Sequence, residues 1–270
     1  MPELPEVEIA RSGITKHISG NTIAQVVAHS ASLRWPISAE LATILPGQIV
    51  QAVERRGKYL LLQCPAGVVL IHLGMTGQLR IVPVGVVPGK HDHFDLIFYD
   101  GVVLRLNDVR RFGSVVWAGS EPYTHELLSE MGPEPLGEEF DGGYLYQKSR
   151  GRKITIKQFL MDHKVVAGIG NIYANESLFH AGIRPTTPAG RLSKIRSHKL
   201  VAAIKTVLTT SIEVGGTMLD FRDGTERYGY FHQELAVYRR EGQPCTVCET
   251  EIQYERLGQK SIYYCKTCQR

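Results

Sequence analysis

The N-terminus of the chain carries two residues, Pro2 and Glu3, that could do covalent chemistry. Methionine aminopeptidases remove Met1 when a small residue follows, which would leave Pro2 with a free secondary amine. An α-amino group titrates near pH ~8, so a useful fraction is nucleophilic at neutral pH, and its attack on a sugar C1′ would give an iminium ion. Glu3 could transfer protons beside it. Proline is also a common structural choice at a helix N-terminus, and the pattern alone favours that interpretation.

Three glycine-containing segments could bring further side chains to a binding surface. Lys58 follows a glycine and opens an apolar strand, so its amine could project from the rim of a sheet. The segment 72–77 places Met75 between two glycines, and the segment 108–113 places Phe112 beside two arginines. Proteins that unstack DNA bases use large apolar side chains next to cations. Each segment alone is more often a basic turn or a piece of the core.

The turn at Gly168–Asn171 predicts a phosphate site between two helices. Its backbone N–H groups are expected to offer donors to an anion, and Asn171 is expected to be the N-cap of the second helix. The basic residues just upstream would surround this turn with positive charge: Lys148, Arg150, Arg152, Lys153 and Lys157. A tight turn without a ligand is the structural alternative.

Four of the five cysteines form two C-x-x-C pairs, Cys245 with Cys248 and Cys265 with Cys268, separated by sixteen residues. Two such knuckles at the ends of a hairpin complete a tetrahedral thiolate shell for Zn²⁺. We predict one structural zinc ion, whose binding supplies most of the folding free energy of this short segment. Cys64 is expected to be a buried small hydrophobe.

Composition and charge limit the classes of protein. With 270 residues, 43% hydrophobic and 21% charged, the chain is predicted to be globular and to have two domains. No apolar run approaches the ~18 residues of a membrane-spanning helix, and the start does not resemble a signal peptide, so we expect a cytoplasmic protein without a membrane partner.

The two halves of the chain differ in charge. Residues 1–146 carry 11 Lys and Arg against 16 Asp and Glu, whereas residues 147–270 carry 20 Lys and Arg against 11 Asp and Glu. The basic second half indicates either a polyanion partner, such as nucleic acid, or a solvated face.

The elements that must position these residues change character along the chain. A helix is expected from Glu3 to about Lys16, and the β-branched runs that follow predict an antiparallel sandwich or barrel. The expected strands are Thr22–Ala28, Gln48–Arg55, Lys58–Cys64, Val68–Leu73, Gln78–Val82, His93–Tyr99, Val102–Asn107 and Gly113–Trp117. The second half is predicted to be helical, with a polar functional loop at Thr217–Gln233. The expected helices are Pro122–Met131, Thr155–His163, Ile172–Ala181 and one around Leu200–Ile212 that ends at Gly215.

Together these motifs resemble the formamidopyrimidine-DNA glycosylase family, bacterial base-excision enzymes for oxidised purines, over essentially the whole chain. The motifs that carry the resemblance are Met1–Glu8, Arg56–Leu60, His72–Met75, Lys90–His93, Arg110–Gly113, Gly132–Leu136, Gly170–Tyr173 and Glu234–Tyr238. The resemblance implies an α+β fold with an N-terminal β-sandwich flanked by helices, a helix-two-turns-helix domain and a zinc-finger hairpin with four cysteine ligands. It also implies a monomer that binds double-stranded DNA between its domains. We expect the catalytic domain at 1–118, a linker at 119–143, the helix-two-turns-helix domain at 144–234 and the finger at 235–270.

The resemblance also implies an activity and its residues. A bifunctional DNA glycosylase and AP lyase would excise 8-oxoguanine and formamidopyrimidines through a Schiff base on Pro2, followed by β,δ-elimination. Glu3 would be the acid/base, and Lys58 the proton donor in β-elimination. The target base must be flipped, because C1′ cannot be reached inside a stacked duplex. The DNA-binding positions would be His72, Met75, His91, Arg110, Phe112, Arg152, Lys157, Asn171 and Glu176. Among them, Met75, Arg110 and Phe112 would fill the gap left by the base, and Glu176 would line the lesion site.

One position departs from the family pattern at a residue expected to act. Lys260 stands where the family finger usually has an arginine that binds phosphate and supports δ-elimination. Lysine keeps the charge but loses the planar fork, so a weaker grip on phosphate is expected.

Two alternative functions remain open from the sequence. The first is an enzyme similar to endonuclease VIII, which uses the same Pro/Glu pair on oxidised pyrimidines. The second is a non-catalytic zinc-finger protein that binds damaged DNA.

Overall fold

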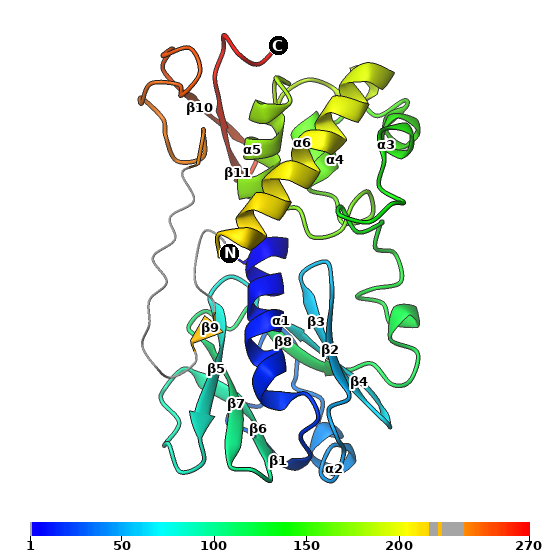
Figure 1. Ribbon diagram of the computed structural model, residues 1–270, viewed down its shortest axis with the longest axis vertical. Coiled ribbons are helices and arrows are strands. Elements are labelled where there is room, and N and C mark those ends of the chain that lie inside the picture. Colours follow the sequence, from blue (N-terminus) through cyan, green and yellow to red (C-terminus); the bar gives the residue numbers. More distant parts are fainter. Residues whose placement is uncertain (1, 216–220, 223–234) are drawn as a thin grey trace. The chain divides into compact units, whose positions relative to one another are not determined.

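The computed structural model describes residues 2–215, 221–222 and 235–270, which belong to two compact units (Figure 1). Unit 1 holds the described residues up to Ser129 together with Gly215 and Phe221–Arg222, and unit 2 holds Glu130–Val214 and everything from Leu235 onward. Apart from Phe221–Arg222, the loop expected at Thr217–Gln233 lies outside the described residues. Strands dominate unit 1 and helices dominate unit 2, which confirms the predicted α+β class.

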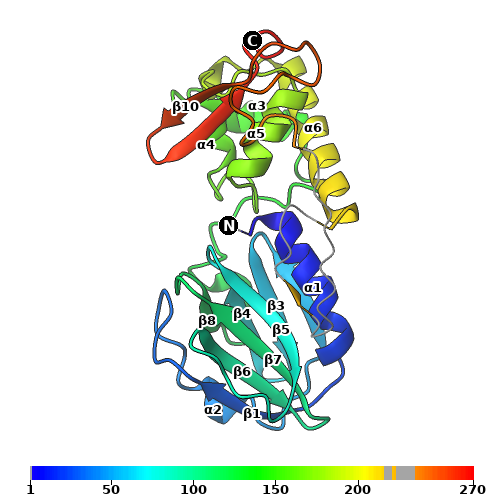
Figure 2. The same ribbon diagram turned by 90° about the vertical axis from the view of Figure 1, so that its left-hand side faces the viewer.

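Unit 1 is a sandwich of two sheets with helix α1 (Leu4–Ile18) beside them (Figure 2). One sheet has the order β1-β6-β7-β5-β9 and the other the order β2-β3-β4-β8; among the described strands only the β5–β9 pair is parallel. The strands are β1 (Ile23–Ala28), β2 (Ala52–Arg56), β3 (Tyr59–Cys64), β4 (Gly67–His72), β5 (Gly77–Pro83), β6 (Asp92–Phe98), β7 (Val102–Asp108), β8 (Ser114–Trp117) and β9 (Phe221–Arg222). All eight strands predicted from the sequence are present, with ends shifted by a few residues.

The core of unit 1 explains why α1 lies on the sandwich. Val7, Ala10, Ile14 and Ile18 recur at helical spacing and are fully buried in one cluster with side chains of both sheets. A short helix, α2 (Leu41–Ile44), was not predicted from the sequence. The helix expected at Pro122–Met131 is wrong: only a single 3-10 turn, Pro122–Thr124, forms there. That segment buries little apolar surface, and a short helix without packing is marginal in water.

Unit 2 is built on helices α3 (Gly142–Ser149), α4 (Ile156–Leu160), α5 (Asn171–His180) and α6 (Lys194–Glu213). Thr155 starts α4 through a capping box with Gln158, and Gly182, with a φ of +68°, follows the end of α5. The sequence missed α3, whose N-cap Asp141 accepts a hydrogen bond from the backbone N–H of Tyr144. A continuous apolar cluster joins the helices into one core.

The chain ends in a hairpin of β10 (Gln253–Leu257) and β11 (Lys260–Tyr264), which lies between the two cysteine pairs as predicted. A small cluster that includes Val237, Ile252 and Tyr263 packs the hairpin against Phe179 of α5. None of the described helices combines the length and hydrophobicity needed to cross a membrane.

Candidate active site and nucleic-acid interface

Pro2 and Glu3 are buried directly before α1 in unit 1. The backbone N–H of Glu3 donates to the Glu6 carboxylate over 2.9 Å, which fixes the first turn of the helix. Pro2 and Pro5 are tolerated here because N–H groups at the start of a helix have no partner within it. The first described residues are thus held in one defined conformation at a helix N-terminus.

Arg55 fastens this helix to the turn that carries Lys58. Its Nε donates to the Glu8 carboxylate of α1 at 2.8 Å, and its Nη1 donates to the Gly57 carbonyl at 3.0 Å. Burial acts to raise the pKa of Glu8, but hydrogen bonds from Arg11 and Arg55 outweigh it, so the pKa lies below the usual value. Lys58 is half-buried in the turn between β2 and β3, at the same end of unit 1 as the start of α1 (Figure 1).

Strand register brings the remaining predicted residues of unit 1 to this end. Tyr59 at the start of β3 pairs with His72 at the end of β4, and Gly77 at the start of β5 pairs with Asp108 at the end of β7. Only four residues separate His72 from Gly77, so the two sheets share this end. The connections at these strand ends carry His72, Met75, His91, Arg110 and Phe112.

His72 orders the loop that follows it. Its Nδ1 accepts a hydrogen bond from the Gly74 N–H at 3.0 Å, and its ring lies 4.8 Å from that of Tyr59. Burial lowers the pKa of His72 to about 4, and the positive charges of Lys58 and Arg34 act in the same direction. The imidazole is therefore neutral at pH 7. Its DNA-binding role stays a prediction, and the contacts described here are internal to unit 1.

Met75, Arg110 and Phe112 form an exposed apolar group with a cation attached. Met75 is 37% exposed and Phe112 is 42% exposed, so both present apolar surface to solvent. The Arg110 guanidinium lies over the Phe112 ring, with its central carbon 4.7 Å from the ring centroid. This arrangement has the chemistry of a wedge that enters a base stack.

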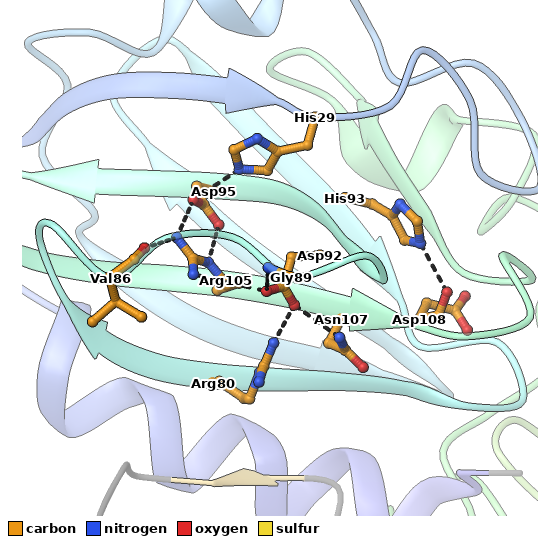
Figure 3. A network of polar contacts seen from close by, with 10 residues as sticks. All are labelled: His29, Arg80, Val86, Gly89, Asp92, His93, Asp95, Arg105, Asn107 and Asp108. Atoms are coloured by element: carbon orange, nitrogen blue, oxygen red, sulfur yellow. Dashed lines mark hydrogen bonds and ion pairs between the residues drawn. The ribbon is translucent and has the colours of Figure 1, made fainter.

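A buried ionic network fastens the connection between β5 and β6 to the sheet (Figure 3). His91 is the last residue of that connection. Asp92 accepts from the Gly89 N–H at 2.7 Å, and Arg105 donates to the Val86 carbonyl at 3.0 Å. Burial acts to raise the pKa of Asp92, but hydrogen bonds from its partners outweigh it and leave the pKa low. The other members of this network are His29, Arg80, Asp95 and Asn107.

In unit 2, Lys157 and Asn171 meet each other and the finger. Lys157 is 1% exposed, and its Nζ lies 2.6 Å from both Asn171 Oδ1 and the Ser261 carbonyl. Asn175 adds a second link, since its Oδ1 accepts from the backbone N–H of Tyr263. The expected Asn171 cap is wrong: the N-cap of α5 is Gly170, and Asn171 is the first helical residue, its side chain turned to Lys157.

Lys260 begins β11 and is exposed. It borders a cavity of about 280 Å³ that is also lined by Lys157 of α4 and by Met161, which follows α4. Arg152 is exposed in the segment before α4 and does not line this cavity. A lysine amine at the mouth of such a cavity can reach an anionic group that enters it.

Glu176 is buried in α5 and holds the segment that leads into the finger. Its carboxylate accepts three backbone N–H groups, from Ala236 at 2.7 Å, Val237 at 3.0 Å and Tyr238 at 2.8 Å. The assignment of Glu176 to the lesion site stays a prediction. The described contacts give it a positioning role within unit 2.

The four cysteines of the two C-x-x-C pairs converge on one point. Their sulfur atoms all lie within 4.8 Å of one another; Cys245 Sγ is 3.9 Å from Cys268 Sγ, and Cys248 Sγ is 3.5 Å from Cys265 Sγ. A tetrahedral shell with metal–sulfur bonds of about 2.3 Å requires sulfur separations of roughly 3.8 Å. The cluster therefore fits a single four-coordinate metal ion.

Sequence reasoning missed the residues that hold these loops together, above all Arg55 and Asp108. For Asp108 a signal existed, because an aspartate that ends a strand before a turn often accepts hydrogen bonds from the turn's N–H groups. Arg55 carried no such signal, since its partner Glu8 is distant in sequence.

Comparison with known proteins matches both units. The model of the formamidopyrimidine-DNA glycosylase N-terminal domain matches residues 1–115, and that of the formamidopyrimidine-DNA glycosylase H2TH domain matches residues 131–223. The formamidopyrimidine-DNA glycosylase of Syntrophotalea carbinolica is 52% identical, with both chains fully covered.

Two solved structures of the Lactococcus lactis enzyme also cover both chains fully. A complex with DNA containing N7-benzyl-Fapy-dG has a TM-score of 0.90 at 32% identity. A complex with DNA containing an oxidised pyrimidine has a TM-score of 0.90 at 31% identity.

Proposed function

Because this chain belongs to the formamidopyrimidine-DNA glycosylase family, we propose that it excises oxidised purines from duplex DNA and then cleaves the strand as an AP lyase. The observation that carries the proposal is the gathering of Lys58, Met75, His91, Arg110 and Phe112 at one end of the sandwich, the end to which Arg55 fastens α1. A nucleophile, a proton donor and a wedge are thereby available on one rigid unit.

The first chemical step uses the Pro2 amine, which is freed when Met1 is removed. The amine nitrogen bonds to C1′ of the damaged nucleotide as the glycosidic C–N bond breaks, and the base leaves with a proton. The adduct opens to an iminium ion when Glu3 gives a proton to the ring oxygen.

The iminium ion is an electron sink for the two eliminations. Loss of a proton from C2′ expels the 3′ phosphate in the β-elimination. Lys58 donates a different proton, to the leaving phosphate oxygen. A second elimination expels the 5′ phosphate, with Lys260 at that phosphate. Water then hydrolyses the Schiff base and regenerates the amine.

Unit 2 supplies most of the grip on the DNA backbone. Arg152, Lys157 and Lys260 neutralise phosphates, the Asn171 amide donates to phosphate oxygens, and His91 contributes from unit 1. The net positive charge of residues 147–270 supports this assignment. The protein acts as a monomer on double-stranded DNA, in the bacterial cytoplasm and at the nucleoid when it is bound.

The metal held by the four cysteines is Zn²⁺ in this proposal. Thiolate ligands in tetrahedral geometry favour zinc, and four protein ligands leave no position for substrate, so the ion is structural. The chemistry that it supplies is the cross-link between Cys245, Cys248, Cys265 and Cys268, which fixes the hairpin that carries Lys260.

Oxidised pyrimidines are the second candidate substrate class. The observation that favours them is the neighbouring Lactococcus lactis structure, which contains DNA with an oxidised pyrimidine. Excision of 8-oxoguanine and of thymine glycol from matched duplexes, measured in single turnovers, ranks the two classes. Faster release of thymine glycol would reverse the assignment to oxidised purines.

Borohydride trapping on duplex DNA with one 8-oxoguanine tests the proposed chemistry. The processed protein is expected to form a covalent adduct whose mass maps to Pro2, whereas a protein that retains Met1 has no free amine there and forms none. Glu3→Gln should still bind this DNA but lose base excision. Equal trapping with and without Met1 would rule out Pro2, and lesion binding without any excision would support the non-catalytic alternative.

A further inference from the structure

The two loops that carry the exposed apolar group touch through their backbones. Gly74 has a φ of +63°, and a Cβ placed on it would lie 2.3 Å from the carbonyl carbon of Phe112 and 2.4 Å from the Gly113 nitrogen. No side chain fits at such distances, so the loop with Met75 and the loop with Phe112 are in contact at Gly74. Contact alone does not fix their relative position, however; that requires directional bonds.

Those bonds converge on one buried carboxylate. Asp108 is 0% exposed, and its Oδ1 accepts from the Thr76 hydroxyl at 2.5 Å and from the Arg110 N–H at 3.2 Å. Its Oδ2 accepts from the Gly113 N–H at 2.8 Å. The Thr76 oxygen also accepts from the Arg110 N–H, at 3.1 Å. One carboxylate therefore binds the first loop through Thr76 and the second loop at both of its ends.

The backbone of Asp108 extends this connection to the His91 segment. Its N–H donates to the His91 carbonyl at 2.9 Å, and its carbonyl is 2.9 Å from His93 Nε2, which is the donor (Figure 3). His93 Nδ1 is in turn 2.8 Å from the Ser30 hydroxyl. The segment at the start of β6 thus holds the backbone of Asp108 in place.

We propose that Asp108, acting through Thr76, is the positioning residue that joins Met75, Arg110 and Phe112 into one preorganised wedge. This inference rests on the proposed function, because a wedge has a role only where a base leaves the stack. Side chains that enter a duplex together must keep their spacing while they displace stacked bases. Loops fixed beforehand avoid the entropy loss of ordering at that moment.

This role requires both acceptor oxygens of the Asp108 carboxylate, and a side chain of the same size with one acceptor does not suffice. In Asp108→Asn the amide retains the size of the carboxylate, but one of its two acceptor atoms becomes an NH2 donor. That NH2 group then faces a backbone donor that the carboxylate had accepted, either the Gly113 N–H or the Arg110 N–H, so the second loop loses one of its two bonds to Asp108. Thr76→Val removes the hydroxyl link while it keeps the side-chain shape, and Thr76→Ser retains the hydroxyl as the matched control.

The test uses duplex DNA with an uncleavable abasic analogue and the fluorescent base 2-aminopurine opposite the gap. Rapid mixing with wild-type protein should give a fluorescence change as the wedge fills the gap. We expect Asp108→Asn and Thr76→Val to slow this phase about tenfold or more, the usual effect of losing a hydrogen bond to a buried charge, and Thr76→Ser to resemble the wild type. This readout needs no catalysis, so it stands apart from any failure of the proposed activity.

Two activity measurements distinguish loss of wedge positioning from a general loss of enzyme activity in the variants. Single-turnover excision of 8-oxoguanine from a duplex should fall with the fluorescence rate. Strand cleavage at an abasic site in single-stranded DNA needs no wedge and should stay at the wild-type rate. An unchanged fluorescence phase in both variants, or an equal fall in single-strand cleavage, would overturn the proposal. If Asp108→Asn does not fold, the Thr76→Val and Thr76→Ser pair decides alone, because Thr76 is partly exposed.

Discussion

Lys157 and Asn171 are hydrogen-bonded to each other, with Lys157 Nζ 2.6 Å from Asn171 Oδ1. The same ammonium lies 2.6 Å from the carbonyl of Ser261, the residue after Lys260. A buried cation that bridges the start of α5 and β11 fixes where Lys260 is presented. The Asn171 amide nitrogen can donate to a phosphate while its oxygen accepts from Lys157.

Lys157→Met should therefore loosen the finger as well as weaken DNA binding. Methionine keeps an apolar stem but leaves two acceptors without their charged donor, a loss of about 1.5–3 kcal/mol. We expect faster removal of the metal by a chelator and roughly tenfold weaker binding to duplex DNA. Lys153→Met, at an exposed neighbour, is the matched control. Weaker binding with an unchanged rate of metal removal would mean that Lys157 acts on the DNA alone and does not hold the finger.

Lys260→Arg should strengthen phosphate binding and promote δ-elimination. A guanidinium offers two parallel donors, whereas the ammonium is a point charge. We expect the wild type to accumulate the β-elimination product and the variant to convert it to the δ-product. A denaturing gel that resolves the two product ends over time measures this, with base excision expected at the same rate in both proteins. An identical product ratio and affinity would show that Lys260 is equivalent to arginine here.

Cys248→Ser should release the metal and weaken DNA binding while unit 1 stays folded. A serine hydroxyl is a poor zinc ligand, and the finger has only a small apolar cluster to hold it without metal. Metal analysis should give about one zinc per wild-type chain and much less in the variant. Cys64→Ser, outside the cluster, should retain the wild-type zinc content. Active wild-type protein without zinc would contradict the assignment.

His72 should make unit 1 less stable in mild acid. Its pKa is lowered to about 4 in the folded protein, against about 6.5 when unfolded, so the unfolded chain binds more protons between these values. Stability is then fully present above pH ~6.5 and falls as the pH approaches 4, by about 2.5 kcal/mol at pH ~4.5.

The His72→Asn variant isolates this effect. Its side-chain oxygen can accept the Gly74 N–H but does not titrate near neutrality. Urea unfolding at pH 7 and pH 4.5 should show a smaller acid loss in the variant than in the wild type. Equal losses in the two proteins would mean that another group causes the acid sensitivity.

The sequence predicts the local elements of this structure better than it predicts the contacts between distant residues. The strands of unit 1 were predictable because β-branched runs bounded by Gly, Pro and Asp report local preference. The cysteine cluster was predictable because its ligand spacing is local to each knuckle. The pairing of Lys157 with Ser261 joins residues far apart in sequence, so no local pattern marks it. The wrong helix at Pro122–Met131 shows the reverse case, a locally plausible segment with too little packing.

The anchored connection between β5 and β6 makes a well-defined attachment point for a dye. Val87 is 84% exposed, yet its neighbours Val86 and Gly89 are fastened to the sheet by Arg105 and Asp92. A cysteine at this position would present a reactive thiol on a fixed backbone in the connection that ends at His91. Burial raises the pKa of the Cys64 thiol to about 11, and ligation of the proposed metal would protect the other four cysteines, so labelling would be selective. The fluorescence of a dye attached there would report when DNA binds to unit 1.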